Sequence, residues 1–343
     1  MDFELSDDQL ALRDAARELL ADHASPGRVR AVVDAGGTHD EKLWAAMVDQ
    51  GWLGVEQPEA AGGLGAGFVE AAVLLEELGR RVAPAPFSQT LLALAALRGT
   101  PWEDRLAGGA IGCVGWARPG DERVLVPYAP VADVAVIATA DRLVVHDLAS
   151  GGRPRREPAM DQTRCVGWLP VDPSRRAATT VGGPDEAAAL LDRGATALAA
   201  ESLGASAEML DRTVEHAKHR VQFGKPIGSF QAVKHRCADM LVDVEGMRST
   251  VYHAAWSLAA GVDRTDASVA ASTAKAWTSD ASRRVMASAL QVHGGIGFTW
   301  EHDLHLYLKR AQLDEVTCGD ASFHRDRLTT LLRPRIESGD PIV

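Results

Sequence analysis

The sequence predicts a mainly helical protein with a small β domain between two helical regions. Apolar side chains recur at helical spacing through the N-terminal part of the chain. Short β-branched runs, separated by Gly, Pro and Asp, then replace that spacing. Long Ala- and Leu-rich segments with short connections follow, which is typical of a four-helix bundle. We therefore expect an N-terminal helical domain over residues 1–105, a middle β domain over 106–185 and a C-terminal four-helix bundle over 186–343.

Three helices are predicted in the N-terminal domain. Ser6 and Gln9 have the spacing of a capping box, in which each side chain binds the other residue's free backbone N–H, so a helix is expected over 6–22. A second helix is expected over 39–50. The third, over 68–79, follows a glycine-rich loop and precedes two prolines that cannot continue it.

The middle domain is expected to be a small antiparallel unit of short strands. Its apolar runs are bounded by turn-forming residues, and they cover 111–116, 124–126, 134–138 and 143–145. Helical spacing then returns in four regions. These are 186–219, a helix that includes 233–247, 267–292 and 303–334.

Composition narrows the possible partners. The formal net charge is −11, which repels nucleic acid and anionic membranes, so an anionic ligand needs a local basic patch. The acidic start at Met1 lacks the apolar core of a secretory signal, and no apolar run approaches the roughly 20 residues that span a bilayer. We expect a cytoplasmic protein. Its four scattered cysteines are expected to be free buried thiols, not metal ligands. They are Cys113, Cys165, Cys237 and Cys318.

Two histidines have a spacing that suits a metal. His302 and His305 are three residues apart. We favour the simpler interpretation, in which both lie at the start of a helix, and we expect no metal site.

A basic cluster surrounds residues 220–231, which join two of the predicted long helices. In an acidic protein such a cluster suits phosphate groups, because guanidinium and ammonium groups bind them through charge-assisted hydrogen bonds. Phe223 could pack beside an aromatic or ribose ring. A solvated, charged turn between helices explains the same residues, and the residues alone leave both interpretations open. The cluster consists of Arg212, Lys218, Arg220, Lys225, Lys234 and Arg236.

A second segment, residues 291–299, ends a predicted helix in three glycines within four residues. Backbone without side chains lets a ligand approach closely, and N–H groups left free can bind phosphate. A plain C-terminal cap, which glycine commonly supplies, is the alternative.

Together the two segments resemble motifs of the acyl-CoA dehydrogenase family. The string R-x-x-F-G-x-x-I-x-x-x-Q begins at Arg220 and ends at Gln231, and Q-x-x-G-G-x-G-F-T begins 60 residues after that, ahead of Arg310. The strings G-W-L-G-V-E-Q-P from Gly51 and G-G-L-G from Gly62 are similar to the family's N-terminal domain. The resemblance covers nearly the whole chain.

The resemblance implies FAD as the cofactor and a barrel-like middle domain. It implies α,β-dehydrogenation of an acyl-CoA thioester to trans-2-enoyl-CoA, in which a Glu removes the α-proton and the flavin accepts the β-hydride. An electron-transfer flavoprotein or a similar acceptor would then take the electrons. Because family members assemble their flavin sites between subunits, an oligomer is implied. By similarity, Arg220, Phe223 and Gln231 contact the FAD of one neighbouring subunit, and Gln291, Gly294 and Gly295 hold the adenosine diphosphate of FAD at another contact.

The chain lacks the family's Glu at both places where the resemblance puts it. Counting nine residues on from Arg310 gives Gly319, and counting 26 back from the arginine of the first string gives Gly194. Asp320 is adjacent to the first place, and Glu201 lies on the same predicted helix as the second. Either could serve as the base. We favour the interpretation that this chain has no base of its own.

The middle domain also departs from the family, since it is short and its T-E-P-x-x-G-S-D string is reduced to A-R-P-G-D at 117–121. These departures resemble the short subunits of actinobacterial α2β2 acyl-CoA dehydrogenases, which pair with a longer subunit and act on bulky substrates such as steroid side-chain CoA thioesters. Three hypotheses follow. They are a subunit whose partner supplies the base, a self-sufficient homotetramer that uses Asp320 or Glu201, and a non-catalytic scaffold for a partner flavoprotein.

Overall fold

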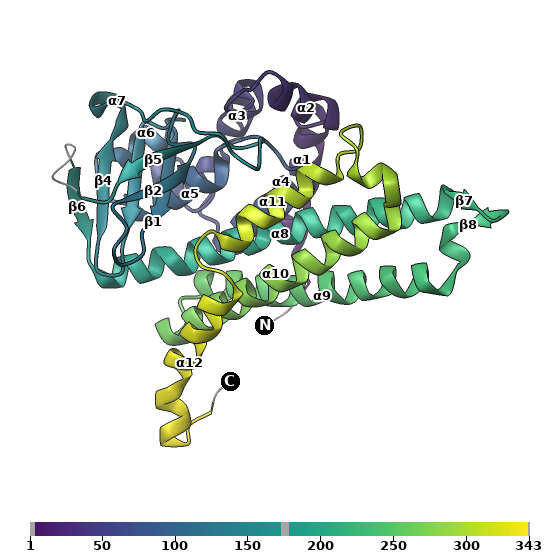
Figure 1. Cartoon of the computed structure of the whole chain (residues 1–343). Coiled ribbons are helices and arrows are strands. Elements are labelled where there is room, and N and C mark those ends of the chain that lie inside the picture. The colour runs from purple at the N-terminus through teal and green to yellow at the C-terminus, as the bar shows by residue number, and fades with distance from the viewer. Residues whose placement is uncertain (1–3, 173–177, 342–343) are drawn as a thin grey trace. The chain divides into compact units, whose positions relative to one another are not determined.

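The computed structural model describes residues 4–172 and 178–341 (Figure 1). The chain forms two compact units, each assembled from segments that are separate in the sequence. The mainly helical fold with a small β region is confirmed, whereas the three-domain division stays a prediction. The helical unit comprises Met1–Arg17, Ala72–Val82 and Ala195–Val343, and the sheet unit comprises Glu18–Ala71 and Ala83–Gly194.

Short helices make up the N-terminal part of the chain. The predicted capping box at the start of α1 is confirmed, since the Ser6 N–H donates to Gln9 Oε1 over 2.9 Å and the Gln9 N–H donates to Ser6 Oγ over 3.3 Å. The sequence reasoning missed three of these helices, which are α2, α5 and α6. The elements are α1 (Asp7–His23), α2 (Pro26–Asp34), α3 (Glu41–Asp49), η1 (Trp52–Gly54), η2 (Glu59–Ala61), α4 (Phe68–Arg80), α5 (Phe87–Ala96) and α6 (Trp102–Ala107).

The sheet unit holds a four-stranded sheet in the order β1-β3-β4-β6 and a separate β2-β5 pair. The prediction that all strands are antiparallel is wrong for β1, which pairs with β3 in parallel. Strand β2 pairs with β5 and not with β1. The neighbour of β1 in the sheet is therefore β3, which runs in the same direction. Helix α5 packs against β1. The elements are β1 (Gly112–Trp116), β2 (Arg123–Pro127), β3 (Val134–Ala138), β4 (Leu143–Asp147), α7 (Leu148–Gly151), β5 (Val166–Pro170) and β6 (Ala178–Gly182).

Long helices form the helical unit, and α10 packs against α9, α11 and α12 (Figure 1). The predicted fourth helical region is two helices, because the chain turns at 317–320. The elements are α8 (Pro184–His219), β7 (Val221–Gln222), β8 (Lys225–Pro226), η4 (Ile227–Ser229), α9 (Gln231–Ala259), α10 (Arg264–His293), η5 (Gly294–Phe298), α11 (Leu304–Val316) and α12 (Ala321–Ser338).

Glycine brings α4 and α8 into backbone contact in the helical unit. A Cβ on Gly79 would lie 1.9 Å from the backbone oxygen of Glu201, and a Cβ on Gly204 would lie 1.8 Å from that of Glu76. No side chain fits at either position. The close packing fixes both glutamates inside this unit, where Glu201 is 4% exposed and Glu76 is 5% exposed.

The four cysteines are free, and three of them are buried, while Cys237 is half-buried. Burial raises the pKa of each thiol, so all four stay protonated and weakly nucleophilic. Among the described residues, no helix is both long enough and apolar enough to span a membrane.

Candidate functional site

The hairpin between α8 and α9 holds an aromatic ring in solvent. Strands β7 and β8 pair antiparallel, which leaves Phe223 and Gly224 as the two turn residues. Both have positive φ, +55° and +78°, as a type I′ turn requires. Positive φ is uncommon for an aromatic residue, and Phe223 is 91% exposed. The ring adds nothing to the core, so it is available to a molecule outside the chain.

The basic cluster around this hairpin divides into paired and unpaired residues. Arg212 binds Glu208 at 2.8 Å and Asp303 at 3.2 Å, and Lys218 binds Glu215 at 2.6 Å. The other members are exposed and make no ion pair within the part of the chain that the structure describes. They are Arg220, Lys225, Lys234 and Arg236. The hairpin end of the unit therefore presents cations that acidic side chains do not neutralise.

The glycine turn after α10 leaves its backbone uncovered. Gly294 has φ +63° and ψ −141°, a region that essentially only glycine adopts. Gly295 has no such conformation, yet a Cβ on either glycine would meet no described atom within 4 Å. Packing within this chain thus does not require glycine at 295, whereas close approach of an outside group would. Gln291 is exposed on the last turn of α10.

Three imidazole rings lie in a row beside this glycine turn, and the sequence reasoning missed the row. The rings of His216 and His293 are stacked with centroids 4.5 Å apart, and His302 is tilted by 59° against His293 at 4.6 Å. Burial lowers the pKa of all three, so the rings are neutral at pH 7. The row connects α8, the end of α10 and the start of α11. The sequence had drawn attention to His302 only for its spacing from His305, and His293 lies inside the second motif.

The two histidines with metal-like spacing have different partners. His302 Nδ1 accepts the Leu304 N–H over 3.1 Å, and the His305 ring stacks on Trp300 at 4.3 Å. Both lie at the start of α11, as the simpler interpretation has it. No group of three or more His, Cys, Asp or Glu among the described residues is arranged to hold a metal.

Glu201, one candidate base, faces an arginine. Its Oε1 is ion-paired with Arg310 Nη1, and Arg310 is 1% exposed. The pair joins α8 to α11 within the helical unit. A general base must face the proton that it removes, and this carboxylate faces a buried cation instead.

Asp320, the other candidate, caps a helix. Its Oδ1 accepts the Phe323 N–H over 2.9 Å at the start of α12. Gly319 beside it has φ +91°, and a Cβ there would lie 2.2 Å from Phe323 Cδ1. The place where the family resemblance puts a Glu is thus closed by the backbone conformation and by a ring.

A buried lysine and a buried histidine hold this turn. Lys275 on α10 is 1% exposed, and burial lowers its pKa to about 8. His324 Nε2 donates to the backbone oxygen of Cys318 over 2.9 Å. Lys275 Nζ donates to the backbone oxygens of Asp314 (2.8 Å), Glu315 (2.8 Å) and Gly319 (3.0 Å).

The remaining family positions lie in the sheet unit. Gly194 is buried inside α8, and its neighbour Arg193 is ion-paired with Glu56 and lies 4.7 Å above the Phe68 ring. The A-R-P-G-D remnant forms a tight turn after β1, in which the Arg118 N–H donates to the side chain of Asp121 over 2.8 Å. Neither place offers a glutamate.

Relatives of known name match nearly the whole chain. It is 38% identical over 312 residues to acyl-CoA dehydrogenase IpdE2 of Mycolicibacterium smegmatis, a match that covers 90% of this chain and 93% of that protein. The IpdE2 of Mycobacterium tuberculosis is 37% identical over 311 residues, which cover 88% and 89%. Residues 6–100 match the acyl-CoA dehydrogenase N-terminal domain, and residues 182–331 match the C-terminal domain. The chain belongs to the acyl-CoA dehydrogenase family.

Solved structures of the family agree with this assignment. The Tcur3481–Tcur3483 steroid ACAD has a TM-score of 0.84 and 29% identity, covering 96% of this chain and 99% of that one. The ChsE4–ChsE5 complex of Mycobacterium tuberculosis has a TM-score of 0.83 and 27% identity, covering 97% and 99%. As a member of the family, the protein is an oxidoreductase that acts on acyl-CoA thioesters.

Proposed function

We propose that this chain is the FAD-contacting subunit of an acyl-CoA dehydrogenase that forms trans-2-enoyl-CoA, and that a longer partner subunit supplies the catalytic carboxylate. The observation that carries the proposal is the closed turn at Gly319, where Phe323 occupies the space that a side chain would need. The same chain keeps the flavin motifs exposed. The chain therefore combines exposed flavin motifs with a closed turn at the place where the family resemblance puts the catalytic Glu.

The exposed residues fit FAD in charge and in shape. Arg220, Phe223 and Gln231 would hold the flavin from one side, with an exposed cation and a largely exposed ring whose edge-to-face contact with Phe230 leaves it open to solvent. Gln291, Gly294 and Gly295 would hold its adenosine diphosphate, because glycine without a side chain lets the phosphates approach the backbone of this turn closely and no described atom obstructs them. FAD, when bound, supplies the acceptor for the hydride from the substrate's β-carbon.

Proton removal is assigned to the partner because both local carboxylates are engaged. Glu201 is bound to Arg310 inside the helical unit, and Asp320 caps α12. A positioned carboxylate contributes about 10²–10⁴ in rate. The α-proton would therefore pass to a glutamate of the partner, at one of the two places that are glycine here.

The substrate and the partner are inferred from relatives. One matched structure is described as a steroid ACAD and the other as a complex of two named polypeptides. We infer an α2β2 complex that acts in the cytoplasm on a bulky acyl-CoA, such as a steroid side-chain CoA thioester. An electron-transfer flavoprotein or a similar protein would reoxidise it.

The test is to purify this chain alone and together with a candidate longer acyl-CoA dehydrogenase subunit from the same organism. Flavin absorbance and acyl-CoA-dependent reduction of a dye are then measured. We expect bound flavin and turnover only from the complex. Full activity from the lone chain would overturn the assignment of the base to a partner.

Arg220→Ala and Arg236→Ala in the complex test the flavin edge. Both arginines are exposed and lack an ion pair among the described residues, so the two substitutions remove the same charge. We expect Arg220→Ala to lower flavin content at least about tenfold, which corresponds to about 1.4 kcal/mol, and Arg236→Ala to leave it unchanged. Unchanged flavin in both variants would favour the scaffold hypothesis.

The homotetramer hypothesis has its own test. If Glu201→Gln or Asp320→Asn abolishes turnover while flavin content stays normal, this chain carries its own base. If both variants keep wild-type turnover in the complex, the homotetramer hypothesis fails.

A further inference from the structure

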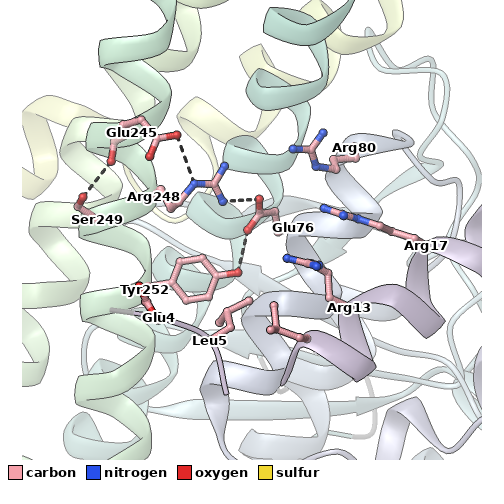
Figure 2. Close-up of a pocket in the computed structure, with 11 residues that line it drawn as sticks. Glu4, Leu5, Arg13, Arg17, Glu76, Arg80, Glu245, Arg248, Ser249 and Tyr252 are labelled. Carbon is pink, nitrogen blue, oxygen red and sulfur yellow. Dashed lines mark hydrogen bonds and ion pairs between the residues drawn. The ribbon is translucent and has the colours of Figure 1, made fainter. Parts of the chain in front are cut away.

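The helical unit contains a cavity of about 730 Å³ between α1, α4 and α9 (Figure 2). This volume lies within the range of about 300–1,000 Å³ found for small-molecule sites. None of its lining residues belongs to the motifs assigned to FAD. We propose that this cavity binds a small ligand through an oxyanion, either a carboxylate or a phosphate.

The one deeply buried acid in the cavity is already bound. Glu76 accepts a hydrogen bond from Arg248 Nη1 over 2.7 Å at Oε1 and from the Tyr252 hydroxyl over 2.8 Å at Oε2. Burial and the neighbouring carboxylate raise the pKa of Tyr252, so its hydroxyl stays protonated and keeps donating. Both donors come from α9. Each oxygen of Glu76 thus has a donor on the α9 side.

Three further guanidinium groups gather on the other side of Glu76. Figure 2 shows Arg13 and Arg17 of α1 and Arg80 of α4 across the carboxylate from Arg248 and Tyr252. Arg13 and Arg17 are four apart on one helix, so their side chains share a face. The helices therefore aim three cations at one space.

Acids beside the cavity orient these arginines without using all their donors. A guanidinium carries five N–H donors, and each arginine here spends only some of them. The Nε of Arg80 is buried with no hydrogen-bond partner among the described residues. The pairs are Arg13–Asp14 (3.0 Å), Arg17–Glu77 (2.9 Å), Arg80–Asp211 (3.1 Å), Arg80–Glu208 (3.6 Å) and Arg80–Glu77 (3.9 Å).

The donors inside the cavity, and not its net charge, favour an anion. Four arginines line it with three glutamates, and the acids beside the cavity offset their charge, but the guanidinium groups keep N–H donors such as Arg80 Nε that have no hydrogen-bond partner among the described residues. The paired N–H donors of a guanidinium match two oxygens of a carboxylate or phosphate. Several guanidinium groups around one space therefore bind such a group in a defined geometry. The apolar side chains of Leu5 and Leu10 also line the cavity and suit a ligand that has a carbon skeleton beside its anionic group.

The experiment is isothermal titration of the full chain with phosphate, pyrophosphate and succinate, at constant ionic strength set with chloride. We expect saturable binding of at least one anion at one site per chain. Arg13→Gln and Arg17→Gln should each weaken it about tenfold, which corresponds to about 1.4 kcal/mol. The matched control is Arg325→Gln, because Arg325 is an exposed arginine paired with Asp280 outside the cavity.

Each outcome decides the proposal. Tighter binding of the phosphates assigns a phosphate ester, and tighter binding of succinate assigns a carboxylate. Absence of saturable binding, or equal weakening by Arg325→Gln, would overturn it. If Arg17→Gln unfolds the chain because Glu77 loses its Arg17 partner, then Arg13→Gln decides alone, since among the described residues Arg13 is paired only with the exposed Asp14.

Discussion

Two glycine turns of the helical unit contain the same residue type for opposite reasons. At Gly295 an added Cβ would meet no described atom within 4 Å, and the backbone is not forced into a left-handed conformation. At Gly319 the backbone has φ +91°, and an added Cβ would lie 2.2 Å from Phe323. One glycine leaves room for something outside the chain, whereas the other is required by the chain itself.

The comparison separates a binding surface from a closed position. The turn at Gly319 is held from inside by Lys275 and His324. The turn at Gly295 lies beside a row of neutral imidazole rings and faces open space. The turn at Gly319 is thus fixed by contacts within this chain, whereas the turn at Gly295 is accessible from outside it.

Gly319→Ala should have the largest effect on stability. Forcing an alanine into the left-handed region costs about 1–2 kcal/mol, and displacing the Phe323 ring adds about 1–3 kcal/mol. The control is Gly120→Ala, since Gly120 has φ +92° with no atom within 4 Å, and it should show the backbone cost alone. Urea unfolding measures both. Equal losses would show that Phe323 does not close the turn.

His324 should make the fold sensitive to acid. Burial lowers its pKa from 6.5 to about 4. Between these values the unfolded chain binds a proton that the folded chain does not, so stability falls with pH through this window and levels off below it. The loss is on the order of 3 kcal/mol. It appears as the difference between the wild type and His324→Gln in urea unfolding at pH 7 and pH 4. A His324→Gln variant that loses stability in acid as steeply as the wild type would remove His324 from the explanation.

Lys275→Met should destabilise the chain by about 2 kcal/mol. Three backbone oxygens of the turn lose a buried donor, at a cost of about 1–3 kcal/mol each. Part of this cost is offset because an ammonium no longer has to be buried. Lys218→Met is the control, since Lys218 is exposed and its surface pair with Glu215 should contribute less than about 1 kcal/mol. Equal urea midpoints for the two variants would show that Lys275 does not stabilise the turn at Gly319.

Gly295→Ala should change stability least, by less than about 0.5 kcal/mol, while it lowers the flavin content of the complex. The added methyl group obstructs nothing in this chain but stands where a phosphate would approach. Gly151→Ala is the control, because its Cβ also meets no atom within 4 Å. Stable protein with normal flavin in both variants would remove Gly295 from the cofactor site.

The sequence predicted the long helices and the first four strands, because their apolar spacing is local, but it missed β5 to β8. It missed α5, in which eight consecutive residues are buried, since a helix buried all round shows no polar face. It missed α2, although Ser25 and Pro26 form a recognisable helix start. It also missed the parallel pairing of β1 with β3, because the local sequence does not show that β2 pairs with β5 outside the four-stranded sheet.

The site was predictable only as far as its motifs. The strings at 220–231 and 291–299 indicated where to look, but not that Phe223 has positive φ or that three imidazole rings lie beside Gly294. Apart from the Ser279 hydroxyl, the described partners of Lys275 are backbone oxygens at least 39 residues further along the chain. Such contacts have no sequence pattern, because any residue offers a carbonyl. The lone lysine in an Ala- and Ser-rich helix was the only available signal.

The ring beneath Gly319 also bears on the history of the lineage. A single codon change to glutamate at 319 would meet Phe323 and a backbone unsuited to any side chain. Regaining an acid would take at least two substitutions and a rebuilt turn, and the intermediates would fold poorly. The backbone conformation and the ring at this position would thus both oppose a change to glutamate, so the proposed reliance on a partner's carboxylate would be hard to reverse.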